Sequence, residues 1–340
     1  MRRVTKRPRG TIRAALGLLL VGSLTGCAPT GGDNHVTIVG LAIGSEGNEA
    51  VAEEFNAQRE DPATFATSFG AAGDQARAVA NGLPADVVHF SIAPDMTRVV
   101  DAGLVDEDWD AGPNNGILTT TVIVFAVREG NPKGIEDWED LIRDDVGIVS
   151  PNPGSAGAAR WNMLAAWAAV LQDGGTEEEA EEYMEAFVDN IEAFPGSGRD
   201  ATTAFLDGTG DVLVTLENEA ILGIQNEEEF EYIIPDQTFL SENPGALTVD
   251  ASPAAEEFFD FALSPEGQAI YAQYGYRPVE SVADEVELGC LEGANDPDDP
   301  FPEVEELATI DDFGGWDQAT EDYFSEDGTI TQIIEESGMG

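Results

Sequence analysis

The order of strand-like and helix-like segments constrains this chain more than any other feature of its sequence. From His35 onward, short apolar runs alternate with segments whose apolar residues recur at helical spacing. This alternation is typical of α/β folds. The first apolar run covers residues 36–42, and the long β-rich run at 119–132 is long enough to cross between two lobes. The sequence therefore predicts an α/β protein.

Local signals mark where several helices begin. Thr176 followed by Glu179 forms a capping box. Ser264 directly precedes Pro265, which is the usual order of an N-cap and the first helical residue. Ser45 stands before the first helix-like segment and is expected to cap it.

Small residues gather at four junctions between a strand and a helix. In an open α/β sheet, ligands bind beyond the carboxyl ends of the strands, where backbone N–H groups and the positive helix end attract anions. A simple tight turn is the alternative interpretation of any one such loop, but four of them favour an anion site. Arg77, Arg160 and Arg199 lie in these segments, and pairing with nearby carboxylates is the alternative role for them. The junctions are residues 44–47, 71–74, 154–158 and 195–200.

The chain is strongly acidic. Its 340 residues include 67 Asp and Glu against 15 Lys and Arg, which gives a net charge of −52. Such a field opposes binding to nucleic acids and to anionic lipid surfaces. Because 42% of the residues are hydrophobic, a packed core is expected, and we interpret the charge as a surface adapted to strong salt.

The N-terminus predicts export and a lipid anchor. Residues 1–26 read as a signal peptide, in which a basic stretch precedes an apolar run (14–24) too short to span a bilayer. The run ends in LTGC, which resembles a lipobox, so Cys27 is expected to be lipidated and residues 27–35 to tether the protein outside the cytoplasmic membrane. An ordinary signal peptide with an incidental cysteine is the alternative. If Cys27 is lipidated, Cys290 has no disulfide partner and is a lone thiol.

Arrangements typical of enzymes and metal sites are missing from the sequence. No GxSxG, GxxxxGK[ST], HExxH or CxxC motif occurs. The histidines after the signal segment are His35 and His89, and His89 lies in a strand-like run where a core position is expected. Asp296, Asp298 and Asp299 do not fit a calcium loop and are read as a solvated acidic segment. The sequence therefore predicts a protein that is not an enzyme and that holds no metal or cofactor.

Six segments, taken in order, resemble the sulfate-binding proteins that feed ABC importers. The resemblance runs from Val36 to about Gln332. It implies a two-lobed, type II periplasmic-binding-protein fold that closes on a dehydrated oxyanion as a monomer and delivers it to a membrane permease and its ATPase. A lipoprotein sensor that kept the fold without transport is the alternative. The segments are NGLPADVV, TTTVIVFAVREGNPKGIEDWEDLI, PNPGSAGAARWNMLAAWAA, GDVLVTLENEAIL, SPEGQAIYAQYGYRP and IDDFGGWDQA.

The resemblance also implies a division of the chain and a set of anion-binding positions. Lobe one is expected to contain residues 36–118 and 250–340, and lobe two residues 119–249. The implied anion-binding residues are Ser45, Ala72, Gly73, Ser155, Ala156, Gly157, Ala158, Gly198, Arg199 and Leu216.

At four of these positions a polar or aromatic side chain of the family's pattern is replaced. Ser45 stands for an aspartate, Ala72 and Ala156 each stand for a serine, and Leu216 stands for a tryptophan. Two hydroxyls and an indole N–H of the family's site are therefore missing, whereas main-chain donors survive such changes. The expected ligand is thus sulfate, thiosulfate or another oxyanion.

Overall fold

The computed structural model describes residues 32–304 and 306–339. Gly31–Gly340 forms one compact unit with its own hydrophobic core. The expected signal peptide and Cys27 lie outside the described residues. Within the described ranges, no helix is both long and apolar enough to cross a membrane.

The strands of the described residues form one sheet with the central order β2-β1-β3-β9-β4-β7-β5-β6. β1, β2 and β3 are parallel, and so are β5, β6 and β7. β8 pairs with β4, and β10 pairs with β9. The bounds are β1 (His35–Leu41), β2 (Thr64–Gly70), β3 (Val87–His89), β4 (Ile117–Arg128), β5 (Ile148–Val149), β6 (Ile191–Ala193), β7 (Val212–Leu216), β8 (Phe230–Ile233), β9 (Gln237–Leu247) and β10 (Glu306–Ala308).

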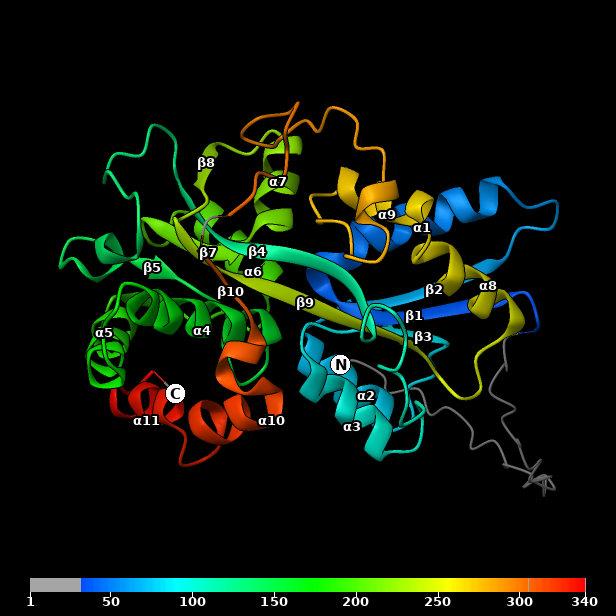
Figure 1. Cartoon of the computed structure of the whole chain (residues 1–340), viewed down its shortest axis with the longest axis horizontal. Helices are drawn as coiled ribbons and strands as arrows, with labels where there is room; N and C mark the ends of the chain where they lie inside the picture. Colours follow the sequence, from blue (N-terminus) through cyan, green and yellow to red (C-terminus); the bar gives the residue numbers. More distant parts are fainter. Residues whose placement is uncertain (1–31, 305, 340) are drawn as a thin grey trace, which may run out of the picture. The chain divides into compact units, whose positions relative to one another are not determined.

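Two long antiparallel strands, β4 and β9, connect the two parallel groups (Figure 1). The first half of β4 pairs with β9, from Thr119 opposite Asn243 to Val122 opposite Leu240. The second half of β4 pairs with β7 and β8, whereas the last residues of β9 pair with β3. This arrangement confirms the predicted α/β fold with two lobes. We call the group around β1–β3 the first lobe and the group around β5–β7 the second lobe.

Helices follow the strands as the sequence pattern predicts. The first lobe carries α1 (Ser45–Ala57), α2 (Ala72–Ala80), α3 (Ala93–Asp101), α8 (Pro253–Ala262) and α9 (Pro265–Gln273). The second lobe carries α4 (Gly157–Gln172), α5 (Glu177–Asp189), α6 (Gly198–Leu206) and α7 (Glu217–Gln225). The C-terminal helices are α10 (Gly315–Ala319) and α11 (Thr329–Glu336).

Two of the three expected helix starts are confirmed. Thr176 and Glu179 form the capping box of α5, and the Ser264 hydroxyl accepts from the N–H of Gly267 at the start of α9. The expectation for Ser45 is wrong, because a 3₁₀ turn precedes α1 and makes Gly44 its N-cap. That turn, Ala42–Gly44, moves the start of α1 away from the end of β1.

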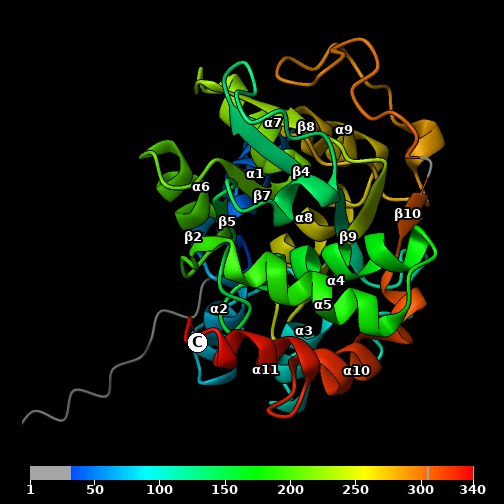
Figure 2. The same cartoon turned by 90° about the vertical axis from the view of Figure 1, so that its left-hand side faces the viewer.

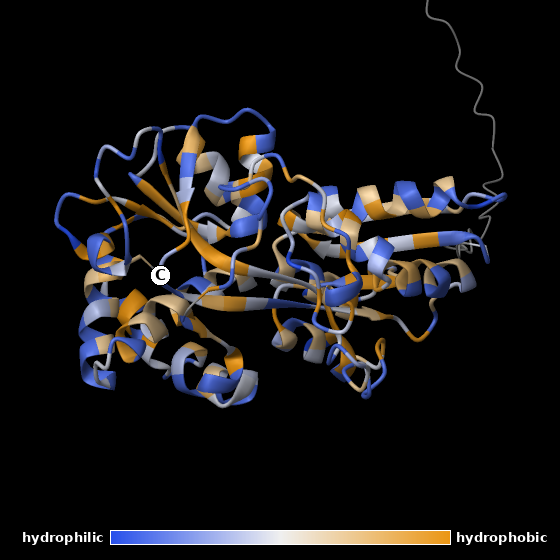
Figure 3. Ribbon diagram, turned by 45° about the horizontal axis from the view of Figure 1, so that its top comes forward, coloured by the Kyte–Doolittle hydropathy of each residue, from blue (hydrophilic) through white to orange (hydrophobic). Residues whose placement is uncertain are grey.

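The core is apolar around the connecting strands, and the hydrophilic faces of the helices point outward (Figure 3). α4 is buried on most of its surface because its many alanines let it pack closely against β9 and α5. Trp161 and Trp167 are buried in the core. His89 is also a core residue: it lies 3.0 Å from both Asn48 and Thr119, and burial lowers its pKa to about 3, so its ring is neutral.

The C-terminal segment packs on the second lobe. The rings of Trp316 and Trp161 lie 4.5 Å apart, and those of Tyr323 and Trp167 lie 5.0 Å apart. α11 runs beside α5 (Figure 2). The expected division places residues 250–340 in lobe one; α10 also contacts α3 of the first lobe, so the C-terminal segment touches both lobes.

Candidate functional site

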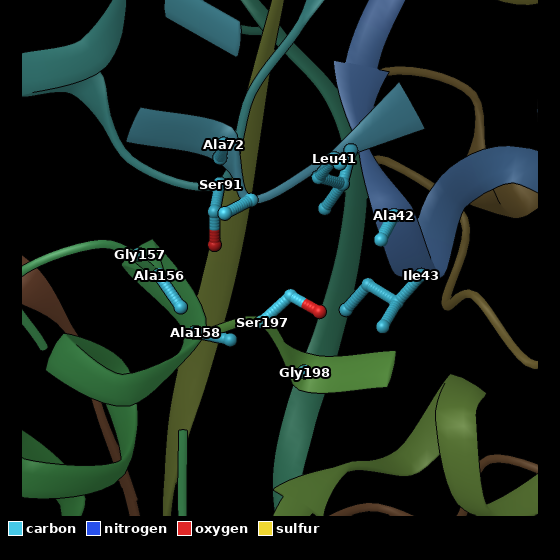
Figure 4. A pocket seen from close by; sticks show the side chains of 12 residues that line it. Leu41, Ala42, Ile43, Ala72, Ser91, Ala156, Gly157, Ala158, Ser197 and Gly198 are labelled. Carbon is cyan, nitrogen blue, oxygen red and sulfur yellow. The ribbon is translucent and has the colours of Figure 1, made fainter. Parts of the chain in front are cut away.

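A small cavity lies where both lobes present the carboxyl ends of their parallel strands (Figure 4). It encloses about 20 Å³, which is room for the centres of one or two water-sized groups. Pockets for organic ligands are typically about 300–1,000 Å³, so the size favours a small inorganic ion. The lining residues are Leu41, Ala42, Ile43, Gly70, Ala71, Ala72 and Ser91 from the first lobe, and Ala156, Gly157, Ala158, Ser197 and Gly198 from the second.

Three helices begin at this cavity. They are α2, α4 and α6, which start at Ala72, Gly157 and Gly198. The first N–H groups of a helix have no acceptor within the helix, and they carry the positive end of the helix dipole. None of the twelve described residues that line the cavity has a charged side chain. The cavity therefore offers hydrogen-bond donors and partial positive charge to an anion, without a counter-ion.

The structure brings five of the ten expected site residues to this cavity and leaves five elsewhere. Those that line it are Ala72, Ala156, Gly157, Ala158 and Gly198. Those that do not are Ser45, Gly73, Ser155, Arg199 and Leu216.

Hydrogen bonds within and between the loops account for three of these displaced residues. The Ser45 hydroxyl donates to the carbonyl of Ala42 at 2.8 Å. The N–H of Gly73 donates to the carbonyl of Ser155 at 3.3 Å, and the Ser155 hydroxyl donates to the carbonyl of Gly196 at 2.8 Å. These groups therefore hold the loops together, and the Gly73–Ser155 bond joins the two lobes beside the cavity.

Arg199 forms ion pairs with two glutamates. Its guanidinium nitrogens lie 2.7 and 3.0 Å from the carboxylate of Glu46 on α1. Its Nε lies 2.8 Å from a carboxylate oxygen of Glu219, which is 3% exposed. Burial raises the pKa of Glu219, and Arg199 opposes that shift. Pairing with carboxylates, the alternative left open by the sequence, is therefore the arrangement that Arg199 adopts.

Leu216 is a core residue. It is 1% exposed at the end of β7, opposite Ile123 of β4, and it belongs to the main hydrophobic cluster. The aliphatic side chain fills a space in the core, where it offers no hydrogen-bond donor.

Sequence reasoning missed two serines that line the cavity. Ser91 follows β3, and Ser197 is the N-cap of α6. The signal for Ser91 was available, because it ends the strand-like run DVVHFS and the carboxyl ends of parallel strands meet at one edge. Ser197 stands in the expected junction 195–200, in the usual position of a capping serine.

A second cavity, of about 50 Å³, adjoins the first and contains a buried carboxyl group. Arg77, Arg98 and Arg160 line it together with Asp95, which is 6% exposed. Burial raises the pKa of Asp95 to about 6, although the three arginines act in the opposite direction.

Replacing Asp95 with asparagine is expected to raise the free energy of unfolding by about 2–3 kcal/mol at about pH 7. The pKa of Asp95 in the folded chain, about 6, exceeds the ordinary aspartate value of 3.8. The folded protein therefore binds this proton more tightly than the unfolded chain does. The stability that the bound proton contributes is complete below pH 3.8 and is lost as the pH rises through about 6. Urea unfolding should show the difference between variant and wild type shrinking as the pH falls to about 4. A difference that does not change with pH would contradict this assignment.

Comparisons with known proteins agree with this geometry. A family model described as bacterial extracellular solute-binding protein matches residues 46–277. The sulfate-binding protein of Synechococcus elongatus is 35% identical over 94% of each chain, and the thiosulfate-binding protein of Escherichia coli is 36% identical over 81% of this chain and 82% of its own. The structure of the sulfate-binding protein SubI from Mycobacterium tuberculosis matches with a TM-score of 0.79 and 39% identity, over 86% of this chain and 100% of that one. The chain therefore belongs to the sulfate-binding protein family of bacterial extracellular solute-binding proteins.

Proposed function

We propose that this protein is the extracytoplasmic solute-binding subunit of an ABC importer, and that it binds sulfate or thiosulfate between its lobes without transforming it. One observation carries the proposal: three helix N-termini, from both lobes, open onto one small cavity whose lining carries no charge. The named relatives are solute-binding proteins for sulfate or thiosulfate, which agrees with a small oxyanion as ligand.

Main-chain donors are sufficient for useful affinity. A hydrogen bond to a charged group contributes about 1.5–3 kcal/mol, and micromolar binding requires about 8 kcal/mol. Four or five such bonds therefore reach the micromolar range. The amides of Ala72, Gly157, Ala158, Gly198 and Ile43 are the donors that we propose, since these residues line the cavity.

The protein's setting follows from the same proposal. Cys27 would be lipidated and anchor a monomer to the outer face of the cytoplasmic membrane, where the acidic surface suits strong salt. We propose that lobe one contains residues 36–118 together with the part of 250–340 that precedes β10, and that lobe two contains residues 119–249 together with 306–336. The contact of α11 with α5 and the ring contacts of Trp316 and Tyr323 with α4 support this revised division, in which α10 also touches α3 of the first lobe.

Titration calorimetry of residues 31–340 in concentrated potassium chloride tests the proposal, because these residues form one compact unit. Sulfate, thiosulfate, molybdate, tungstate and phosphate are added in turn, with a series of chloride concentrations as control. We expect sulfate or thiosulfate to bind in the micromolar range or more tightly. Folded protein that binds none of these oxyanions would contradict the proposed function.

A further inference from the structure

The hydroxyl of Ser91 is a buried polar group with no hydrogen-bond partner in the described part of the chain. The residue is 2% exposed, and its oxygen points into the cavity from the end of β3 (Figure 4). Buried polar atoms almost always have a partner, and leaving one without is costly. The position of this hydroxyl therefore indicates that its partner is a group held in the cavity.

The second serine of the cavity does not share this property. The Ser197 hydroxyl accepts from the N–H of Asp200 at 3.1 Å and donates to the carboxylate of the same residue at 2.8 Å. Its proton is therefore committed within α6. Apart from these two serines, the residues that line the cavity are glycine, alanine, leucine and isoleucine. Among the described residues that line the cavity, Ser91 is therefore the one whose side chain has a proton without an acceptor.

Both lobes fix the position of Ser91. Its carbonyl accepts from the indole Nε1 of Trp161 at 2.8 Å, and Trp161 is fully buried in α4 of the second lobe. The preceding residue, Phe90, donates its N–H to the carbonyl of Pro244 in β9 at 2.9 Å. Both bonds use the backbone of this segment, so the hydroxyl is held in place but remains free to donate.

The opposite wall of the cavity leaves room at this point. A Cβ at Gly157 would lie 2.7 Å from the Cβ of Ser91 and 3.0 Å from its hydroxyl oxygen. The absence of a side chain at Gly157 therefore keeps the space in front of the hydroxyl open, while the N-terminus of α4 faces the same space.

We propose that Ser91 donates a side-chain hydrogen bond to the oxyanion, and so replaces donors that Ala72 and Ala156 do not supply. The inference rests on the proposed function and adds a residue that determines affinity. A serine hydroxyl both donates and accepts, so with an ionised oxyanion it acts as the donor and keeps its proton. No charge is added to the site, which agrees with its uncharged lining.

The test compares Ser91→Ala with a matched serine variant in residues 31–340, which form one compact unit. Ser241 in β9 is also buried, its hydroxyl also has no partner within the described ranges, and it does not line the cavity. We expect Ser91→Ala to raise the Kd for sulfate about 10- to 100-fold, the range of one charge-assisted hydrogen bond, and Ser241→Ala to change it less than about twofold. Ser91→Cys, which keeps the size and supplies a weak donor, should resemble Ser91→Ala.

Urea unfolding without added anion separates a binding role from a structural one. Removal of a hydroxyl that bonds to no protein group is expected to leave stability unchanged or slightly raised in both serine variants. If the wild type binds sulfate and Ser91→Ala binds it equally well, the inference about Ser91 is wrong and the proposed function still stands. An equal loss in Ser241→Ala would also overturn it. If the folded wild type binds no oxyanion, the proposed function fails and the inference fails with it.

Discussion

Replacing Gly157 with alanine is expected to weaken sulfate binding more than about a hundredfold, or about 2.7 kcal/mol, while the protein stays folded. The added methyl group would lie 2.7 Å from the Cβ of Ser91 and 3.1 Å from Cγ2 of Ile92, both on the other lobe. It therefore either occupies the anion's space or keeps the lobes from closing. Stability is expected to hold, because Gly157 is the first residue of α4 and alanine is the better helix former.

Gly196→Ala is the matched control for this experiment. Gly196 lies in the neighbouring loop of the same lobe, and the nearest atom to an added Cβ is a carboxylate oxygen of Asp200 at 3.9 Å. The Kd of Gly196→Ala for sulfate should stay within about threefold of the wild-type value in the same titration. Wild-type affinity in Gly157→Ala would show that the ion binds elsewhere.

Replacing Arg199 with methionine is expected to lower the free energy of unfolding by about 3–5 kcal/mol at about pH 7. The change leaves the carboxylate of Glu219 buried without its cation, and burial already raises the pKa of that group. Because the pKa of Glu219 is raised in the folded state, the loss should become smaller as the pH falls and the group takes up a proton. Urea unfolding over a range of pH measures both effects.

Two further variants isolate the buried charge as the cause. Glu46→Gln removes the other partner of Arg199. Because the Glu46 side chain is 34% exposed, this change should lower the free energy of unfolding by only about 0–1 kcal/mol. The double variant Arg199→Met with Glu219→Gln should recover most of the stability, since no buried charge then remains unpaired. Equal losses in Arg199→Met and Glu46→Gln would argue against this explanation.

Local patterns predicted an α/β fold and the junctions from which three helices start at the cavity. The capping box at Thr176 depends on residues three positions apart, so the sequence alone determines it. Small residues marked the junctions 71–74, 154–158 and 195–200, where α2, α4 and α6 begin, and the carboxyl ends of the strands were the expected place for a ligand. The structure adds that these three junctions meet at one cavity.

Contacts between distant residues account for what the sequence did not reveal. Arg199 and Glu46 are 153 positions apart, and Ser155 and Gly196 are 41 apart, so no local pattern indicates that they pair. Ser45 was expected at the cavity, but a three-residue 3₁₀ turn precedes it. Residues 41–43 line the cavity in its place. Ser91 was missed because it lies outside the four junctions with small residues.

Anomalous diffraction from crystals of residues 31–340 grown with selenate tests the central claim most directly. Selenate has the shape and charge of sulfate, and selenium locates it without ambiguity. The account predicts an anomalous peak in the cavity, within hydrogen-bond distance of the amides of Gly157, Ala158 and Gly198 and of the Ser91 hydroxyl. A selenate-binding protein whose anomalous peak lies outside this cavity would contradict it.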